Sequence, residues 1–135
     1  MVTKIRRTRA DGFTLIELMI VMAIIVILAG IATALYVNSI QRSKEAVLKS
    51  DLFRMRDAID QYYADKNKYP PSLESLVSEK YLRTIPVDPI TNSSETWQTT
   101  MAEPQPGASF TDTGIFDIKS GAEDTALDGT RYADW

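Results

Sequence analysis

Glu17 is the residue whose chemistry depends most on its surroundings, because it is the only charged residue in the apolar run from Phe13 to Val37. A carboxylate at the middle of a membrane-spanning helix costs about 2.5–3.5 kcal/mol, and less near an end. Glu17 lies one turn from the start of the run, so its side chain can reach lipid headgroups while the helix is alone. If several such helices bundle, that contact is lost and Glu17 needs a cationic partner. A glutamate tolerated at the membrane surface is the alternative.

Few other groups could support catalysis, since the chain contains no histidine and no cysteine. The Ser-His-Asp and Cys-His arrangements and the usual zinc sites therefore cannot be built. Catalysis by carboxylates alone is the remaining route, but most of the carboxylates have the pattern of solvated surface. We therefore do not expect an enzyme.

The apolar run is long enough to cross a membrane. As a helix, residues 13–37 would extend for about 37 Å at 1.5 Å per residue, and a hydrocarbon core of about 30 Å needs about 20 residues. We interpret residues 13–37 as the transmembrane half of a long helix.

Charge is distributed unevenly about this run. The net charge of −3 divides into +3 for residues 1–12 and −6 for the remainder. Basic residues before a membrane span favour a cytoplasmic N-terminus, which leaves the acidic body on the other side. An acidic folded part also argues against nucleic-acid binding, which requires a basic patch.

The helical pattern continues through residues 38–68 as an amphipathic half. Apolar residues recur at steps of four and three residues, the period of one helix face, at Leu48, Leu52, Met55, Ile59 and Tyr62, with Ile40 and Val47 as earlier members of the face. Tyr69-Pro70 ends the pattern, because a proline disfavours helix in the residue before it.

Residues 69–135 predict a small globular α+β region. We expect a short helix over 72–82 with Ser72 as its N-cap, an extended turn over 85–89, and strands at 96–101 and 114–119 joined through a loop at 103–107. The second strand alternates apolar and polar residues, as a half-buried strand does. An acidic, turn-rich tail follows from 120 to 135.

The segment Gly12-Phe13-Thr14-Leu15-Ile16-Glu17, between a basic leader and an apolar run, resembles the signal of type IV prepilins and type II secretion pseudopilins. The resemblance implies that a prepilin peptidase cuts between Gly12 and Phe13, so that residues 1–12 are a cleaved leader, and that Phe13 is then N-methylated. It also implies that Glu17 meets the Phe13 amino group of an adjacent subunit. Two unit charges about 4 Å apart at an effective dielectric of 20 gain about 4 kcal/mol.

Two other interpretations of the N-terminal segment compete with this one. Ala32-Thr33-Ala34 imitates the cleavage site of an ordinary secretory signal, although the apolar region before it exceeds the usual length of about 7–15 residues. The segment could also be an uncleaved anchor. Neither alternative predicts a cut after Gly12.

Gly30 lies among small residues that allow close helix packing in lipid, namely Ala29, Ala32 and Ala34. Glycine weakens a helix by about 1 kcal/mol relative to alanine, so we hypothesise that the helix loosens near Gly30 on assembly, as related pilins suggest. Many members of that family carry a proline soon after this point, whereas here the next proline is Pro70.

The downstream stretches 65–76 and 81–89 resemble the G-type major pseudopilin of type II secretion. Adhesive type IV pilins usually close their C-terminal region with a disulfide, which this chain cannot form. The resemblance implies a pilin-like fold, with a long helix packed on a small antiparallel sheet. It also implies a subunit that is first anchored in the inner membrane. An inner-membrane assembly platform then adds it, together with other pseudopilins, to a filament in the periplasm. The filament promotes protein export across the outer membrane. An adhesion or motility pilin and a signal-processed soluble binding protein are the alternatives.

The acidic tail carries the remaining candidate site. G-type pseudopilins bind calcium in a C-terminal hairpin, and the matching residues here are Asp124 and Asp128, with Ser120 as a further ligand. Oxygen ligands on a flexible loop suit Ca²⁺, which accepts six to eight of them. Glu123-Asp124-Thr125 departs from the Asp-Gly more common in the family, and a solvated acidic surface is the alternative. No other cofactor is expected.

Overall fold

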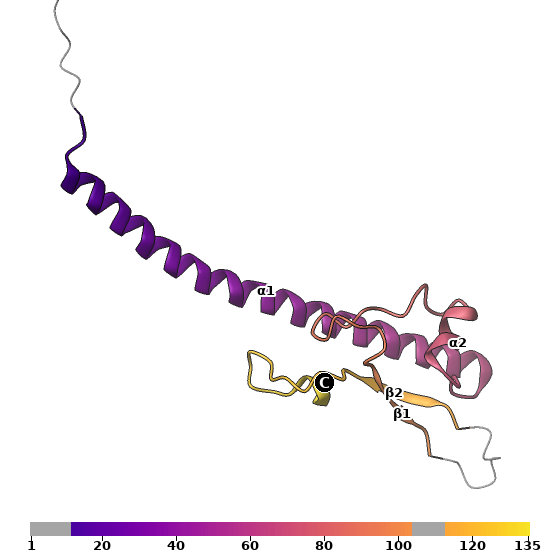
Figure 1. Cartoon of the computed structure of the whole chain (residues 1–135). Coiled ribbons are helices and arrows are strands. Elements are labelled where there is room, and N and C mark those ends of the chain that lie inside the picture. The colour runs from indigo at the N-terminus through magenta and orange to yellow at the C-terminus, as the bar shows by residue number, and fades with distance from the viewer. Residues whose placement is uncertain (1–11, 104–112) are drawn as a thin grey trace, which may run out of the picture. The chain divides into compact units, whose positions relative to one another are not determined.

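The computed structural model describes residues 12–103 and 113–135. Its elements are the helix α1 (Leu15–Lys66), the short helix α2 (Leu73–Ser78), the strands β1 (Gln98–Met101) and β2 (Ile115–Lys119), and the 3-10 helix η2 (Tyr132–Asp134) (Figure 1). The chain divides into two compact units, Met1–Asn38 and Ser39–Trp135. Residues 1–11 of the expected leader and 104–107 of the expected loop lie outside the described residues.

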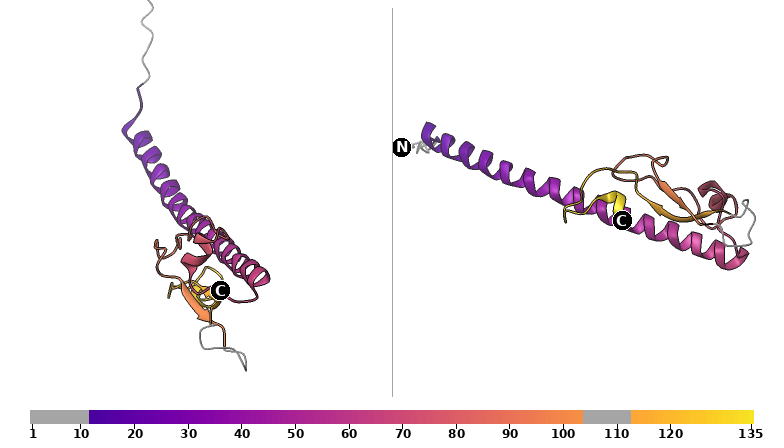
Figure 2. Two further views of the ribbon diagram at one scale, coloured as in Figure 1. Left: turned by 90° about the vertical axis from the view of Figure 1, so that its right-hand side faces the viewer. Right: turned by 90° about the horizontal axis from the view of Figure 1, so that it is seen from below.

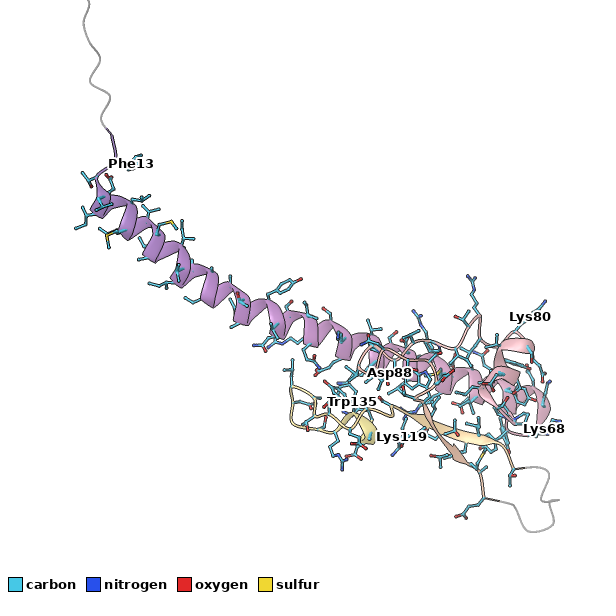
Figure 3. All side chains as sticks on the ribbon, in the orientation of Figure 1. Phe13, Lys68, Lys80, Asp88, Lys119 and Trp135 are labelled. Carbon is cyan, nitrogen blue, oxygen red and sulfur yellow. The ribbon has the colours of Figure 1, made fainter. Side chains whose placement is uncertain are left out.

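In the first unit, every residue from 12 to 38 is exposed. The apolar side chains surround the helix between Phe13 and the end of this unit (Figure 3). Within the described residues, α1 is the one helix whose length and composition would allow it to cross a membrane. A helix that is apolar on all sides is typical of a segment whose partners are lipid or other helices.

In the second unit, α1 supplies one wall of the core. The predicted positions Leu48, Leu52, Met55, Ile59 and Tyr62 are buried, together with Ala58. They pack with residues of the other elements, including Leu76, Trp97, Ile115, Ile118 and Tyr132.

Two predicted members of the buried helix face are instead exposed, Ile40 by 40% and Val47 by 49%. Ile40 lies two turns before the first buried residue of α1. Val47 is rotated by about 100° from Leu48 around the helix, which places it outside the covered stripe.

The sheet is a two-stranded antiparallel ribbon with one irregularity. Thr100 pairs with Asp117 and Met101 pairs with Ile115, so Phe116 is an extra residue on β2. The extra residue breaks the predicted alternation, because a bulge sets two residues opposite one. Ile115 and Ile118 are both buried as a result, whereas Phe116 is 55% exposed. β1 begins two residues later than predicted and β2 one residue later.

The ends of both α-helices are set by local backbone geometry. Asn67 adopts a left-handed conformation (φ 54°), which ends α1 two residues before the predicted limit. Ser72 caps α2 as predicted, accepting a hydrogen bond from the Ser75 N–H at 3.3 Å. Lys80 (φ 68°) turns the chain out of the helix, so α2 ends at Ser78 and not at Leu82.

Two glycines allow backbone segments of the second unit to approach closely. A Cβ on Gly114 would lie 2.5 Å from the Tyr69 carbonyl oxygen, and one on Gly121 would lie 2.0 Å from that of Thr96. The absence of a side chain at these two positions lets the backbone at each end of β2 lie close to a connecting segment. The two-stranded sheet lies beside the second part of α1 in both views of Figure 2.

Candidate processing and assembly site

Thr14 sets the beginning of α1. Its hydroxyl oxygen accepts a hydrogen bond from the Glu17 N–H at 3.2 Å, and its carbonyl accepts one from the Leu18 N–H at 3.2 Å. Thr14 is therefore the N-cap of the helix. Sequence reasoning missed this role, although threonine followed three residues later by glutamate is the signature of a capping box.

Gly12 and Phe13 precede the helix, so the peptide bond between them lies outside regular structure. A Cβ on Gly12 would meet no atom within 4 Å, and the Phe13 side chain is 82% exposed (Figure 3). The fold of this chain therefore does not itself require glycine at position 12. A requirement for glycine there would come from an enzyme that must approach the backbone closely.

Glu17 lies in the first turn of α1. The unpaired N–H groups of a helix N-terminus carry partial positive charge, which favours a nearby carboxylate by about 0.3–1 kcal/mol. Ion pairs in the described part of the chain join Arg56 to Asp117 and Lys66 to Glu79, so Glu17 has no cationic partner among the described residues. The helix terminus offsets only part of the cost of burying this carboxylate in a bundle.

Gly30 lies inside α1, and a Cβ at this position would meet no atom within 4 Å. The helix is continuous through it, from Leu15 to Lys66. One turn away, the Thr33 hydroxyl donates to the Ala29 carbonyl at 2.8 Å. The loosening predicted near Gly30 concerns the assembled state and stays a prediction.

The three expected calcium ligands differ in their surroundings. Ser120 is fully buried, and its hydroxyl donates to Asp88 at 2.5 Å. Asp124 and Asp128 are exposed on the tail. The side chain and the backbone of Thr130 donate to the Asp128 carboxylate, which lowers its pKa.

These ligands do not fit a metal site built from side chains. Among residues 12–103 and 113–135, no group of three or more acidic side chains gathers where an ion could be held. The calcium site at Asp124, Asp128 and Ser120 remains an untested expectation from the family resemblance.

Asp88 is a buried carboxylate that the sequence placed in a turn and in the stretch 81–89 of the family resemblance, without indicating its burial. One of its carboxylate oxygens accepts hydrogen bonds from the N–H groups of Ile90 and Thr91, at 2.8 and 3.3 Å. The other oxygen accepts from Ser120. The Asp88-Pro89 pair is a known turn signal, but its connection with Ser120, 32 residues later, depends on the tertiary fold.

Arg56 makes a second connection that was not predicted. It donates to the Asp117 carboxylate at 2.8 Å and to the carbonyl oxygens of Ile118 and Trp135, both at 2.9 Å. The guanidinium group thus joins α1 to β2 and to the tail, and its several fixed donors suit it to this position.

Residues 7–33 match the model of a protein family described as "Prokaryotic N-terminal methylation motif". This range contains the junction, Glu17 and Gly30.

Longer similarities extend beyond the motif. The type II secretion system core protein G of Pseudomonas aeruginosa is 33% identical over an aligned length of 100 residues, and the match covers 62% of this chain and 70% of that protein. The protein of the same name from Escherichia coli is 31% identical over 94 residues, covering 58% and 65%. The type IV major fimbrial protein FimA of Dichelobacter nodosus is 53% identical over 57 residues, covering 42% and 36%. No solved structure matches the chain.

Proposed function

We propose that this chain, which belongs to the family of type II secretion system core protein G, is a structural subunit of a secretion pseudopilus. The observation that carries the proposal is the form of α1: its first part is apolar on all sides, while its second part is packed into a small domain. Such a helix suits a subunit held first by lipid and later by neighbouring copies. The role is structural, with no catalytic residues.

The first part of α1 fits a membrane anchor. The basic leader and the acidic body favour a cytoplasmic N-terminus and a periplasmic C-terminal domain. In this arrangement, a prepilin peptidase on the cytoplasmic side cuts between Gly12 and Phe13, and Phe13 is then N-methylated. The exposed junction before the Thr14 cap supports this step, because the peptidase need not unwind the helix to reach the bond.

Assembly then depends on Glu17 and on the amino group freed at Phe13. An inner-membrane platform and other pseudopilins would add each subunit to a helical filament, whose growth promotes export across the outer membrane. In the apolar core of the filament, the Glu17 carboxylate would pair with the Phe13 amino group of a neighbouring copy. Gly30 and the small residues near it would allow close packing of the helices.

Similarity to fimbrial proteins keeps an adhesion or motility pilus as the second candidate. The core protein G relative from Pseudomonas aeruginosa aligns with 62% of the chain, whereas the Dichelobacter nodosus fimbrial protein aligns with 42%. The larger share favours the secretion role. A signal-processed soluble protein would lack the apolar helix, and the match to the methylation motif weighs against it.

Processing can be tested by intact mass and N-terminal sequencing of the protein from inner membranes, with Gly12→Val beside the wild type. We expect the wild type to start at N-methylated Phe13 and the variant to keep its leader, because a branched side chain hinders close approach of the peptidase to the backbone. Ala10→Val, in the leader, is the matched control and should be processed normally. A wild-type protein starting at Leu35 or Met1 would contradict the filament proposal.

A further inference from the structure

Residues 120–135 form a closed loop after β2. An antiparallel bridge between Thr125 and Arg131 joins its two arms, and the Ala126 N–H donates to the Thr130 carbonyl at 2.7 Å. Backbone hydrogen bonds within the loop therefore determine its shape, and other contacts attach it to the rest of the second unit.

Glu45, on α1, accepts two hydrogen bonds from this loop. Its Oε1 atom accepts hydrogen bonds from the Leu127 N–H at 2.9 Å and from the Tyr132 hydroxyl at 2.8 Å. The Gln41 amide donates to the same hydroxyl at 2.6 Å. The Tyr132 side chain is fully buried, so its hydroxyl needs these partners. Burial, and then the bond to Glu45, raise the pKa of Tyr132, so the hydroxyl keeps its proton as a donor.

The groups that converge on Glu45 from the loop are donors, a backbone N–H and a phenol O–H. Donors attract an anion and repel a cation, whereas calcium requires six to eight oxygen acceptors. The chemistry at this point therefore calls for a carboxylate, and α1 provides one.

Several oxygen atoms of this loop that could serve a metal already have hydrogen-bond partners. The Ser120 hydroxyl donates to Asp88 and accepts from the Ala122 N–H. The Asp124 carbonyl accepts from the Tyr132 N–H at 3.2 Å. One Asp128 oxygen accepts from both the N–H and the hydroxyl of Thr130, at 2.9 and 2.6 Å.

The end of the loop is held by further contacts of the same kind. The Trp135 indole N–H donates to the Thr130 hydroxyl at 2.7 Å, and the Lys49 ammonium lies 4.3 Å from the centre of the Trp135 ring. Trp135 also stacks edge-on against Tyr132. These contacts attach the end of the loop through side chains of the protein itself.

We propose that Glu45 fastens residues 120–135 in place of the calcium ion that the family resemblance implies, and that the second unit is stable without a divalent cation. This attachment of residues 120–135 to α1 concerns only the folding of the second unit. It does not depend on whether the chain assembles into a secretion pseudopilus or another pilus.

The test is thermal unfolding of the full-length chain in detergent micelles, followed by tryptophan fluorescence in calcium chloride or in a calcium chelator. We expect the same midpoint in both solutions. Glu45→Ala should lower the midpoint by about 4–8 °C in both, because it removes an acceptor shared by two donors. Glu123→Ala, an exposed acidic residue of the same segment, is the matched control and should leave the midpoint unchanged.

Tyr132→Phe keeps the buried ring and removes only the hydroxyl, so it tests the same closure should Glu45→Ala fail to fold. We expect a smaller decrease, again independent of calcium. A wild-type midpoint that rises by about 4 °C or more with calcium would overturn the proposal. So would midpoints of Glu45→Ala and Tyr132→Phe equal to that of the wild type.

Discussion

Residues 15–38 and 39–66 belong to one helix, yet the first part has no buried side chain whereas the second buries six. Both parts are rich in apolar residues, but the first is apolar on all sides and the second along one stripe. The stripe has its partner within the chain, because its buried residues pack against the other elements of the second unit. A helix that is apolar on all sides requires surroundings without water but does not select a particular partner. No other described part of this chain covers it, so lipid or other helices must do so.

The largest effect should come from removing the one charge in the first part. Glu17→Gln should leave membrane insertion and leader removal unchanged but abolish filaments, since it would delete the charge pair proposed between Glu17 and a neighbouring Phe13 amino group, worth about 4 kcal/mol. Electron microscopy of sheared filaments would measure this. Glu17→Asp keeps the charge on a shorter side chain and should retain partial assembly. Normal filaments from Glu17→Gln would show that the carboxylate has no partner in the assembly.

A pair of truncations compares the two parts directly. Leu52→Ala opens a cavity in the core and should lower the free energy of unfolding of the second unit by about 2–5 kcal/mol. Ile27→Ala removes a similar volume from an exposed position and should leave this free energy unchanged. Urea unfolding of the full-length chain in detergent, followed by tryptophan fluorescence, would measure both. Equal losses would mean that the first part also packs within the chain.

The smallest expected effect is on pH dependence in the second part. Burial raises the pKa of Asp51, with Arg54 opposing the shift and Asp88 adding to it. A raised carboxyl pKa means that the folded state holds its proton more tightly. The associated stability is therefore present below the unfolded pKa of 3.8 and is lost as the pH rises through the folded pKa.

Asp51→Asn should accordingly be slightly more stable than the wild type at pH 7. The advantage should disappear near pH 3, where the wild-type carboxyl is protonated in both states. Urea midpoints at the two pH values would show this, and a variant less stable at pH 7 would indicate that attraction to Arg54 outweighs burial.

Elements with a strong local signal could be predicted from the sequence. The spacing from Leu48 to Tyr62 placed the buried face of α1, and Ser72 placed the start of α2. The left-handed Asn67 and the extra residue Phe116 were missed, because many residues could occupy those positions and only the surrounding contacts select them. Asp88, Arg56 and Glu45 were missed for a stronger reason: their partners lie 32 to 87 residues away in the sequence, and no local pattern contains that information.

The attachment of Tyr132 to Glu45 has a consequence for the order of folding. The two residues are 87 positions apart, so their contact closes almost the whole second unit into one loop. Contacts of such long range form slowly, because the chain loses conformational freedom before they compensate for it. Gln41 and Glu45 of α1 therefore gain the Tyr132 hydroxyl as a partner only when the last residues of the chain are in place. We therefore expect the attachment of the tail to α1 to be a late step in the folding of the second unit.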